Sequence, residues 1–151
     1  MRLEMVGLFL GMTEKTRHAV AALASEEALE RGNYLFQAGE PAADVYVLKQ
    51  GRVRVKMGAA GHVAIILCDT GDLIGWAGMA GLASHFASAE CLDSVKVWKF
   101  DNAALRALLE ADPISGMHFY RVLAEVIGRR LVASYGATVA VQGERHPKYW
   151  G

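Results

Sequence analysis

The spacing of apolar residues changes twice along the chain, and each change predicts a change of secondary structure. Behind Thr13, which can cap a helix, the apolar side chains recur at helical spacing to about Ala24. From Gly32 to about Phe100 they form short apolar or alternating runs separated by turn residues. The expected strands are residues 34–36, 45–48, 53–55, 63–67 and 95–100. Regularly spaced short strands with glycine turns are typical of an antiparallel barrel or jelly roll.

Helical spacing returns after Asp101. Asp101 or Asn102 can cap a helix over residues 103–110, and the sequence from Ala111 to Pro113 ends it. A long helix is then expected over residues 114–141. One side of it carries Met117, Tyr120, Leu123, Ala124, Ile127 and Leu131, and a second apolar side carries Phe119, Val122 and Val126. A helix that is apolar on two sides needs two coverings, so we expect the second side to pack on its own barrel and the first to pair with a second copy.

Composition places the chain among globular proteins of one domain. It has 151 residues, of which 53% are hydrophobic and 21% charged, and its formal net charge is zero. A neutral chain has no overall attraction to nucleic acid or to an acidic membrane surface. The N-terminus has no basic region followed by an apolar stretch, so we expect a cytoplasmic protein with no membrane segment. Cys68 and Cys91 lie far apart in apolar, strand-like contexts and are expected to be free, buried thiols.

The sequence contains neither a clustered metal-binding motif nor a motif for a catalytic nucleophile. Four histidines lie on separate expected elements without H-x-H or H-x₃-H spacing: His18, His62, His118 and His146. A zinc or iron site is therefore not expected. A barrel enzyme of the cupin type needs a clustered histidine and carboxylate site, which disfavours this alternative. The serines Ser84, Ser88 and Ser94 lie in no nucleophile-elbow context, so we expect no catalytic residues and no enzyme.

The turn glycines carry a resemblance to a known family. Glycines 32, 39, 51, 71 and 75 lie in "ERGNYLFQAGEPAADVYVLKQGRVRV" and "GDLIG" as the turn glycines lie in the cyclic nucleotide-binding domain. The chain resembles the sensor half of the CRP/FNR transcription regulators, over roughly residues 8–131. This resemblance implies a mainly β fold with flanking helices: a double-stranded β-helix (a jelly-roll β-roll), an N-terminal helix and a long C-terminal helix that forms a homodimer.

The resemblance also divides the single domain of residues 1–151 into parts. These are an N-terminal helical part (1–31), the β-roll (32–101) with a phosphate-binding cassette at 71–87, the C-terminal helices (102–141) and a tail (142–151). About 20 residues follow Leu131, too few for the winged helix-turn-helix of such regulators, so no DNA-binding domain is expected in this chain. Arg129 and Arg130 are expected on a solvated face of the helix.

In the family a short helix after the second glycine of "GDLIG" holds a cyclic phosphate, because a helix N-terminus offers free N–H groups and the positive end of its dipole. A glutamate follows that glycine, and an arginine beyond the helix pairs with the phosphate. Here Trp76 follows Gly75, and His85 stands at the arginine position. No lysine or arginine occurs between Gly61 and Lys96, so the backbone of the cassette is kept and its two charged anchors are replaced.

The expected ligand-binding residues are Gly75, Trp76, Ala77, Gly78, Met79, His85, Phe86, Ala87 and Tyr120. Trp76 is either a platform for a different ligand or a plug that fills the vacated pocket, and the second interpretation is favoured. His85 is either a pH-dependent phosphate contact or a partly exposed loop histidine, again with the second favoured. Because the helix pairing closes the ligand pocket in the family, residues near Tyr120 to Leu123 are expected to lie over the turn from Gly75 to Ala80.

The sequence therefore predicts a sensor or regulatory module of CRP/FNR type. The implied ligand is a cyclic nucleotide or a related small anion, and no other cofactor is expected. Cyclic AMP itself is expected to bind weakly, because both anchors are missing. Two alternatives stay open: a dimerisation or protein-interaction module that binds no ligand, and the disfavoured cupin-like metal enzyme.

Overall fold

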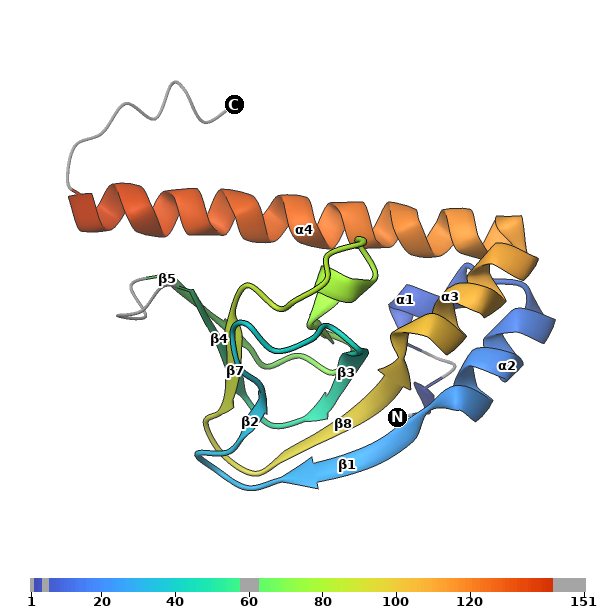
Figure 1. Ribbon diagram of the computed structural model, residues 1–151, viewed down its shortest axis with the longest axis horizontal. Helices are drawn as coiled ribbons and strands as arrows, with labels where there is room; N and C mark the ends of the chain where they lie inside the picture. The colour runs from blue at the N-terminus through green and yellow to red at the C-terminus, as the bar shows by residue number, and fades with distance from the viewer. Residues whose placement is uncertain (1, 4–5, 58–62, 143–151) are drawn as a thin grey trace.

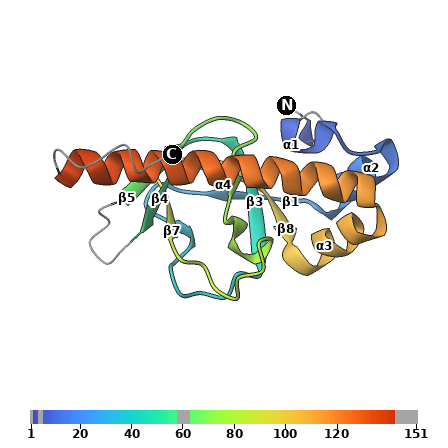
Figure 2. The same ribbon diagram turned by 90° about the horizontal axis from the view of Figure 1, so that it is seen from above.

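In the computed structural model, residues 2–3, 6–57 and 63–142 are described, with residues 63–64 and 136–142 described for the backbone alone. Two short helices, α1 (Gly7–Leu10) and α2 (Glu14–Leu23), lie beside α3 (Asn102–Ala111) at one end of a β-roll (Figure 1). The long helix α4 (Pro113–Gln142) runs from these helices across the roll, and the view from above shows it lying over the strands (Figures 1 and 2). The predicted helices are therefore confirmed.

Two antiparallel sheets form the roll. The first has the strand order β1 (Ser25–Leu29), β8 (Val95–Asp101), β3 (Asp44–Gln50) and β6 (Leu73–Ile74). The second has the order β2 (Tyr34–Phe36), β7 (Ser88–Cys91), β4 (Val53–Met57) and β5 (Val63–Leu67). Every strand pair is antiparallel, which confirms the predicted jelly roll.

Strand β1 lies where the sequence predicted only a helical part. Its sequence SEEAL carries two glutamates and little apolar character, so no strand pattern was evident. It forms because β8 offers an edge: Ser25 pairs with Lys99 and Leu29 with Val95. The Glu27 carboxylate accepts a hydrogen bond from Lys99 Nζ at 3.2 Å across this pair. Tertiary pairing has therefore overridden a weak local preference.

The central strands are buried on both faces, which explains why they read as continuous apolar runs. In β3, Val45 and Val47 pack toward the helices, whereas Tyr46 and Leu48 point into the roll, as the two-residue period of a strand requires. The core beneath the helices includes Phe9, Phe100, Leu105, Leu109 and Phe119. The core inside the roll includes Phe36, Leu48, Val53, Ile74 and Val97.

A polar cluster joins the ends of three helices. The hydroxyls of Thr13, Thr16 and Ser115 donate to Asp112 Oδ2 at 2.6, 2.7 and 2.6 Å. Thr13 is the predicted N-cap of α2, and its hydroxyl accepts from the backbone N–H of Thr16. Of the two cap candidates for α3, Asp101 is the N-cap and accepts from the Ala104 N–H at 2.8 Å. The cluster fixes the start of α4, and so the direction of the helix over the roll.

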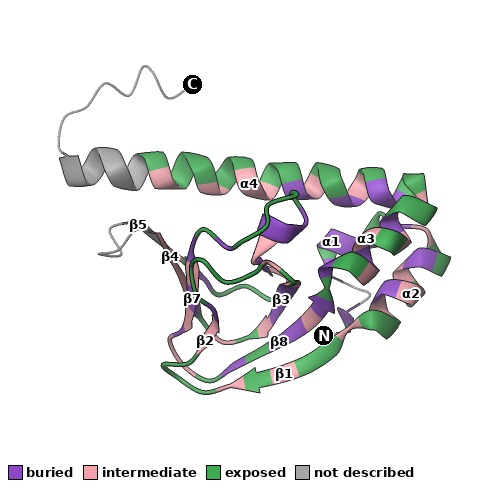
Figure 3. Ribbon diagram, viewed as in Figure 1, coloured by how far each residue is buried: buried purple, intermediate pink, exposed green. Residues whose placement is uncertain are grey.

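Helix α4 buries a different stripe from the one expected. Phe119 lies in the core as predicted, but Leu123 is also buried, with 3% of its surface exposed, against the helices of its own chain. The prediction that Leu123 faces a second copy is therefore wrong. The exposed side, shown green along α4 in Figure 3, includes Ile114, Met117, Tyr120, Leu131 and Val132.

Candidate functional site

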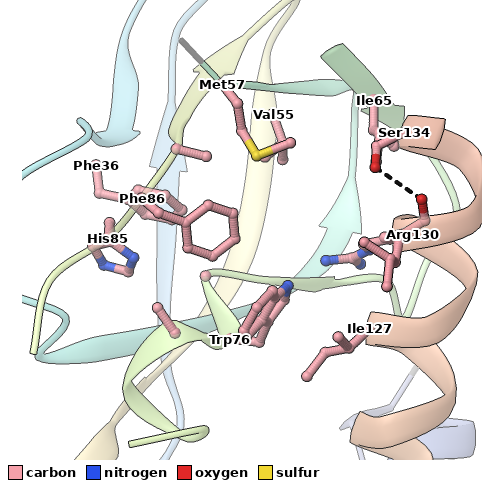
Figure 4. Close-up of a pocket in the computed structure, with 14 residues that line it drawn as sticks. Phe36, Val55, Met57, Ile65, Trp76, His85, Phe86, Ile127, Arg130 and Ser134 are labelled. Carbon is pink, nitrogen blue, oxygen red and sulfur yellow. Dashed lines mark hydrogen bonds between the residues drawn. The ribbon is translucent and has the colours of Figure 1, made fainter. Parts of the chain in front are cut away.

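A cavity of about 280 Å³ lies between the turn after β6, the open face of the second sheet and α4 (Figure 4). Its floor and walls come from Phe36, Val55, Met57, Ile65, Gly75, Trp76, Ala77, His85, Phe86 and Ala87. Helix α4 closes the remaining side with Ile127, Arg130, Leu131 and Ser134. Any occupant therefore touches the cassette and the long helix together.

The turn that opens the cassette depends on glycine. Gly75 has φ +80°, and a Cβ on it would lie 2.8 Å from Phe36 Cε1. After it, the single-turn 3₁₀ helix η2 (Trp76–Gly78) is anchored from beneath, since Arg106 Nη2 donates to the Gly78 carbonyl at 2.5 Å. Gly78 itself packs so tightly on Asn102 that an added Cβ would lie 2.0 Å from Asn102 Nδ2. The cassette backbone is thus held rigidly against the roll and α3.

Trp76 forms a wall of the cavity and does not fill it. Part of its side chain packs on the core beneath the helices, and its ring lies 4.9 Å from the ring of Phe86, tilted by 52°. Space for a ligand remains beside this aromatic pair (Figure 4). The open cavity favours the aromatic platform over the plug, and the choice between the two interpretations stays a prediction.

His85 is not the partly exposed loop histidine that the sequence favoured. Only 5% of its surface is exposed, and its ring stacks on Phe36 at 3.7 Å between centroids. Its backbone is fixed as well, because its N–H donates to the Glu40 carbonyl at 2.9 Å and its carbonyl accepts from the Gly39 N–H at 2.8 Å. Burial lowers the pKa of the imidazole, and the carboxylates of Glu40 and Asp44 oppose this shift only in part. His85 is therefore neutral at pH 7.

Arg130 is the residue that the sequence placed on the wrong side. Its neighbour Arg129 does lie on the solvated face and pairs with Glu125 at 3.2 Å. Arg130 instead reaches inward from α4 toward Trp76 (Figure 4). Its Nη2 donates to the Leu73 carbonyl. Burial lowers the pKa of the guanidinium, while the Asp72 carboxylate raises it. Because an arginine pKa begins above 12, the side chain keeps its charge.

Six of the nine predicted residues line the cavity: Gly75, Trp76, Ala77, His85, Phe86 and Ala87. The other three do not. Met79 is buried in the core beneath the helices, Gly78 packs on Asn102, and Tyr120 lies about two helical turns before Ile127. Tyr120 is therefore not a lining residue of the cavity within one chain, whereas Leu123, from the same predicted segment, lies in one core cluster with Met79.

The sequence did not predict the cavity-lining residues of the roll, Phe36, Val55, Met57 and Ile65. Nor did it predict those of α4, which are Ile127, Arg130, Leu131 and Ser134. The α4 residues carry a readable signal, since 127, 130, 131 and 134 follow the spacing of one helix face. That spacing identifies one face of α4. Which turn of α4 reaches the cavity depends on how α2, α3 and the junction at Asp112 place the helix, and this tertiary arrangement cannot be read from the sequence of α4.

Within residues 2–3, 6–57 and 63–142, no group of three histidine, cysteine, aspartate or glutamate side chains is arranged to hold a metal ion. In the same part of the chain, no helix has the length and apolar character needed to cross a bilayer. Both cysteines are free thiols, and Cys91 is buried as expected. Cys68 is exposed, so the prediction that it is buried is wrong; it follows the end of β5 at Leu67.

Comparison with known proteins identifies the family. The cyclic nucleotide-binding domain matches residues 26–112, and the chain belongs to this family. Solved structures with the same fold include a provisionally named cyclic nucleotide-binding protein of Geobacter metallireducens, with TM-score 0.75 and 20% identity, covering 86% of this chain and 96% of the other. The N-terminal domain of a transcriptional regulator of Streptomyces coelicolor has TM-score 0.62 and 25% identity, covering 87% and 92%.

A second comparison finds a similar region within a much longer protein. A Rhodopseudomonas palustris protein, provisionally named as a potassium channel, is 25% identical over 126 residues, which are 83% of this chain. The chain spans 31% of the length of that relative. The matched region is thus a domain that occurs in proteins of different overall organisation.

Proposed function

We propose that this chain is a sensor or regulatory module that binds a small molecule in the cavity beneath α4 and carries no catalytic activity. The observation that supports this proposal most directly is that the cassette and α4 both contribute residues to the cavity wall. Trp76 and Phe86 come from the cassette and Ile127 and Leu131 from α4, so an occupant bridges the two. A ligand that binds better to one position of α4 would shift the helix toward that position.

The ligand is expected to differ from cyclic AMP. The carboxylate that accepts the ribose hydroxyls in the family is replaced by Trp76, and no carboxylate lines the cavity within the described residues. His85 is neutral and stacked on Phe36, so it offers no cationic partner for a phosphate at the arginine position. The polar groups of the sugar would enter apolar walls unpaired, which costs binding free energy.

The open cavity favours a ligand-binding module over a module that only dimerises. The described residues contain no metal-binding cluster that would support the alternative of a cupin-like enzyme. A location in the cytoplasm stays a prediction.

Calorimetry and thermal shift with cyclic mononucleotides, cyclic dinucleotides and small organic anions test the proposal, because a ligand that binds only the folded state raises the melting temperature. The decisive variant is Ile127→Trp, which fills the cavity from α4. Ala133→Trp is the matched control, at an exposed position of the same helix. Binding that is lost in Ile127→Trp and kept in Ala133→Trp supports the proposal. If nothing in the collection binds the unmodified protein, or if Ile127→Trp binds equally well, the cavity is not the sensing site.

We further propose that the module is a homodimer joined along α4, as the family resemblance implies. Ile114, Met117 and Val132 expose 70%, 66% and 62% of their surfaces, and single-chain proteins seldom leave so many large apolar side chains of one helix in water. Ala124 and Gly128 lie in the same stripe and leave room for close approach of a second helix. The same patch on a second copy would cover it symmetrically.

A further inference from the structure

The cavity combines apolar walls with a single charged group. Among its described lining residues only Arg130 carries a charge, and the other polar side chains are Trp76, His85 and Ser134. Ser134 Oγ donates to the Leu131 carbonyl at 2.8 Å, and the His85 ring is stacked on Phe36. The cavity therefore offers strong hydrogen-bond donors at one place, the guanidinium.

Within the described residues, the guanidinium of Arg130 has fewer acceptors than it has N–H donors. It has five N–H donors in a planar fork, and the described residues supply one hydrogen-bond acceptor, the Leu73 carbonyl. Asp72 acts on it electrostatically, but no ion pair holds Arg130 within the described part of the chain, whereas Arg129 one residue earlier is paired with Glu125. A partly buried cation without a counter-ion is costly, so a site of this kind favours an anion.

Size and charge narrow the class of anion. The space of about 280 Å³ suits a small molecule with an apolar body, and one cation balances one negative charge. A planar carboxylate matches the guanidinium fork in a bidentate pair, which a spherical anion does not. A doubly charged group would leave one charge unpaired against Trp76, Phe86 and Met57.

We propose that the ligand of this module is a small organic monoanion, whose carboxylate pairs with Arg130 of α4 and whose apolar body lies against Trp76 and Phe86. This inference rests on the proposed function of the cavity and names the ligand class and its anchor. The anchor lies on the long helix, where the family's cassette arginine would lie on the loop after η2. The carboxylate competes with the Leu73 carbonyl for the guanidinium, so its binding acts directly on the contact between α4 and β6.

A matched pair of probes tests the charge: 2-naphthoate and its neutral amide, 2-naphthamide, by calorimetry on the full chain. We expect the acid to bind the unmodified protein at least about 10-fold more tightly than the amide. Arg130→Gln should weaken the acid by about 10- to 100-fold and leave the amide unchanged. Arg129→Gln, one residue away and exposed, should bind both probes as the unmodified protein does.

Arg130→Lys keeps the charge without the fork, and we expect it to recover only part of the affinity for the acid. Circular dichroism melts of the variants show that they fold, and Arg130→Lys takes the place of Arg130→Gln where the latter does not. Equal binding of acid and amide, or an acid affinity unchanged in the Arg130 variants, overturns the anchor while leaving a ligand-binding cavity in place. Binding of neither probe, with a cyclic nucleotide binding tightly, overturns the ligand class and keeps the proposed sensor function.

Discussion

The ring of His85 lies parallel to the ring of Phe36, with centroids 3.7 Å apart and an angle of 11° between the planes. The pair closes the inner end of the cavity, where a family member would present a cationic side chain. Burial favours the neutral imidazole, so a group that could have been a charged anchor has become part of the apolar wall.

This pair makes folding stability depend on pH. The pKa of His85 is lower in the folded state than its ordinary value near 6.5. At a pH between these two values, the unfolded chain therefore binds more protons than the folded chain. The free energy of unfolding should therefore fall as pH decreases below about 6.5, with a slope from this residue of at most about 1.4 kcal/mol per pH unit. His85→Phe keeps the stack and removes the titrating group. Urea denaturation of both proteins from pH 5 to pH 7.5 measures the difference, and parallel curves would contradict the prediction.

Asp112 should control the acid limit of stability. Hydrogen bonds from Ser115, Thr13 and Thr16 hold the pKa of its carboxyl far below the usual range. The stabilising effect is therefore present above the ordinary pKa near 3.9 and is lost as pH falls below it. Asp112→Asn should lower the melting temperature at pH 7 and make unfolding less dependent on pH between about 5 and 3. Asp69→Asn, on an exposed turn, is the control; if both variants melt alike at pH 7, the helix junction does not depend on Asp112.

Trp76→Ala distinguishes a wall from a plug. Because Trp76 is only partly buried beside an existing cavity, the substitution should cost about 1–2 kcal/mol of folding free energy. Trp98→Ala, at a core position with 4% exposure, should cost about 3–5 kcal/mol. Urea denaturation gives both values. A cost for Trp76→Ala as large as that for Trp98→Ala would restore the plug interpretation.

Much of the fold could be predicted because the local signals agreed. Thr13 caps α2, Asp101 caps α3 and Pro113 begins α4, and each is a signal that acts within one turn of a helix. The turn glycines were equally local, since Gly75 requires a positive φ wherever the rest of the chain lies. Strand β1 was missed for the opposite reason: only its partner β8 makes Ser25–Leu29 a strand.

The side of α4 that lines the cavity could not be predicted from the helix alone. Successive residues differ by about 100° around a helix, so Arg129 and Arg130 face different surroundings although they look alike in the sequence. Two adjacent arginines suggested one solvated patch, and only the placement of α4 over the roll separates them. Leu123 shows the same effect, because an apolar stripe does not reveal which of two coverings it meets.

The dimer is best tested on residues that the structure leaves exposed. Met117→Glu and Val132→Glu together would place like charges across the proposed twofold axis, so the double variant should be a monomer with an otherwise normal fold. Leu123→Glu is unsuitable for this purpose, since it would bury a charge in the core of its own chain and unfold the protein. Lys15→Glu together with Arg17→Glu, on α2, adds charge of the same sign away from the patch and serves as the control. Light scattering at micromolar concentration should give a dimer for the unmodified protein and the control and a monomer for the double variant. A monomer for the unmodified protein would mean that the exposed side of α4 does not pair with a second copy.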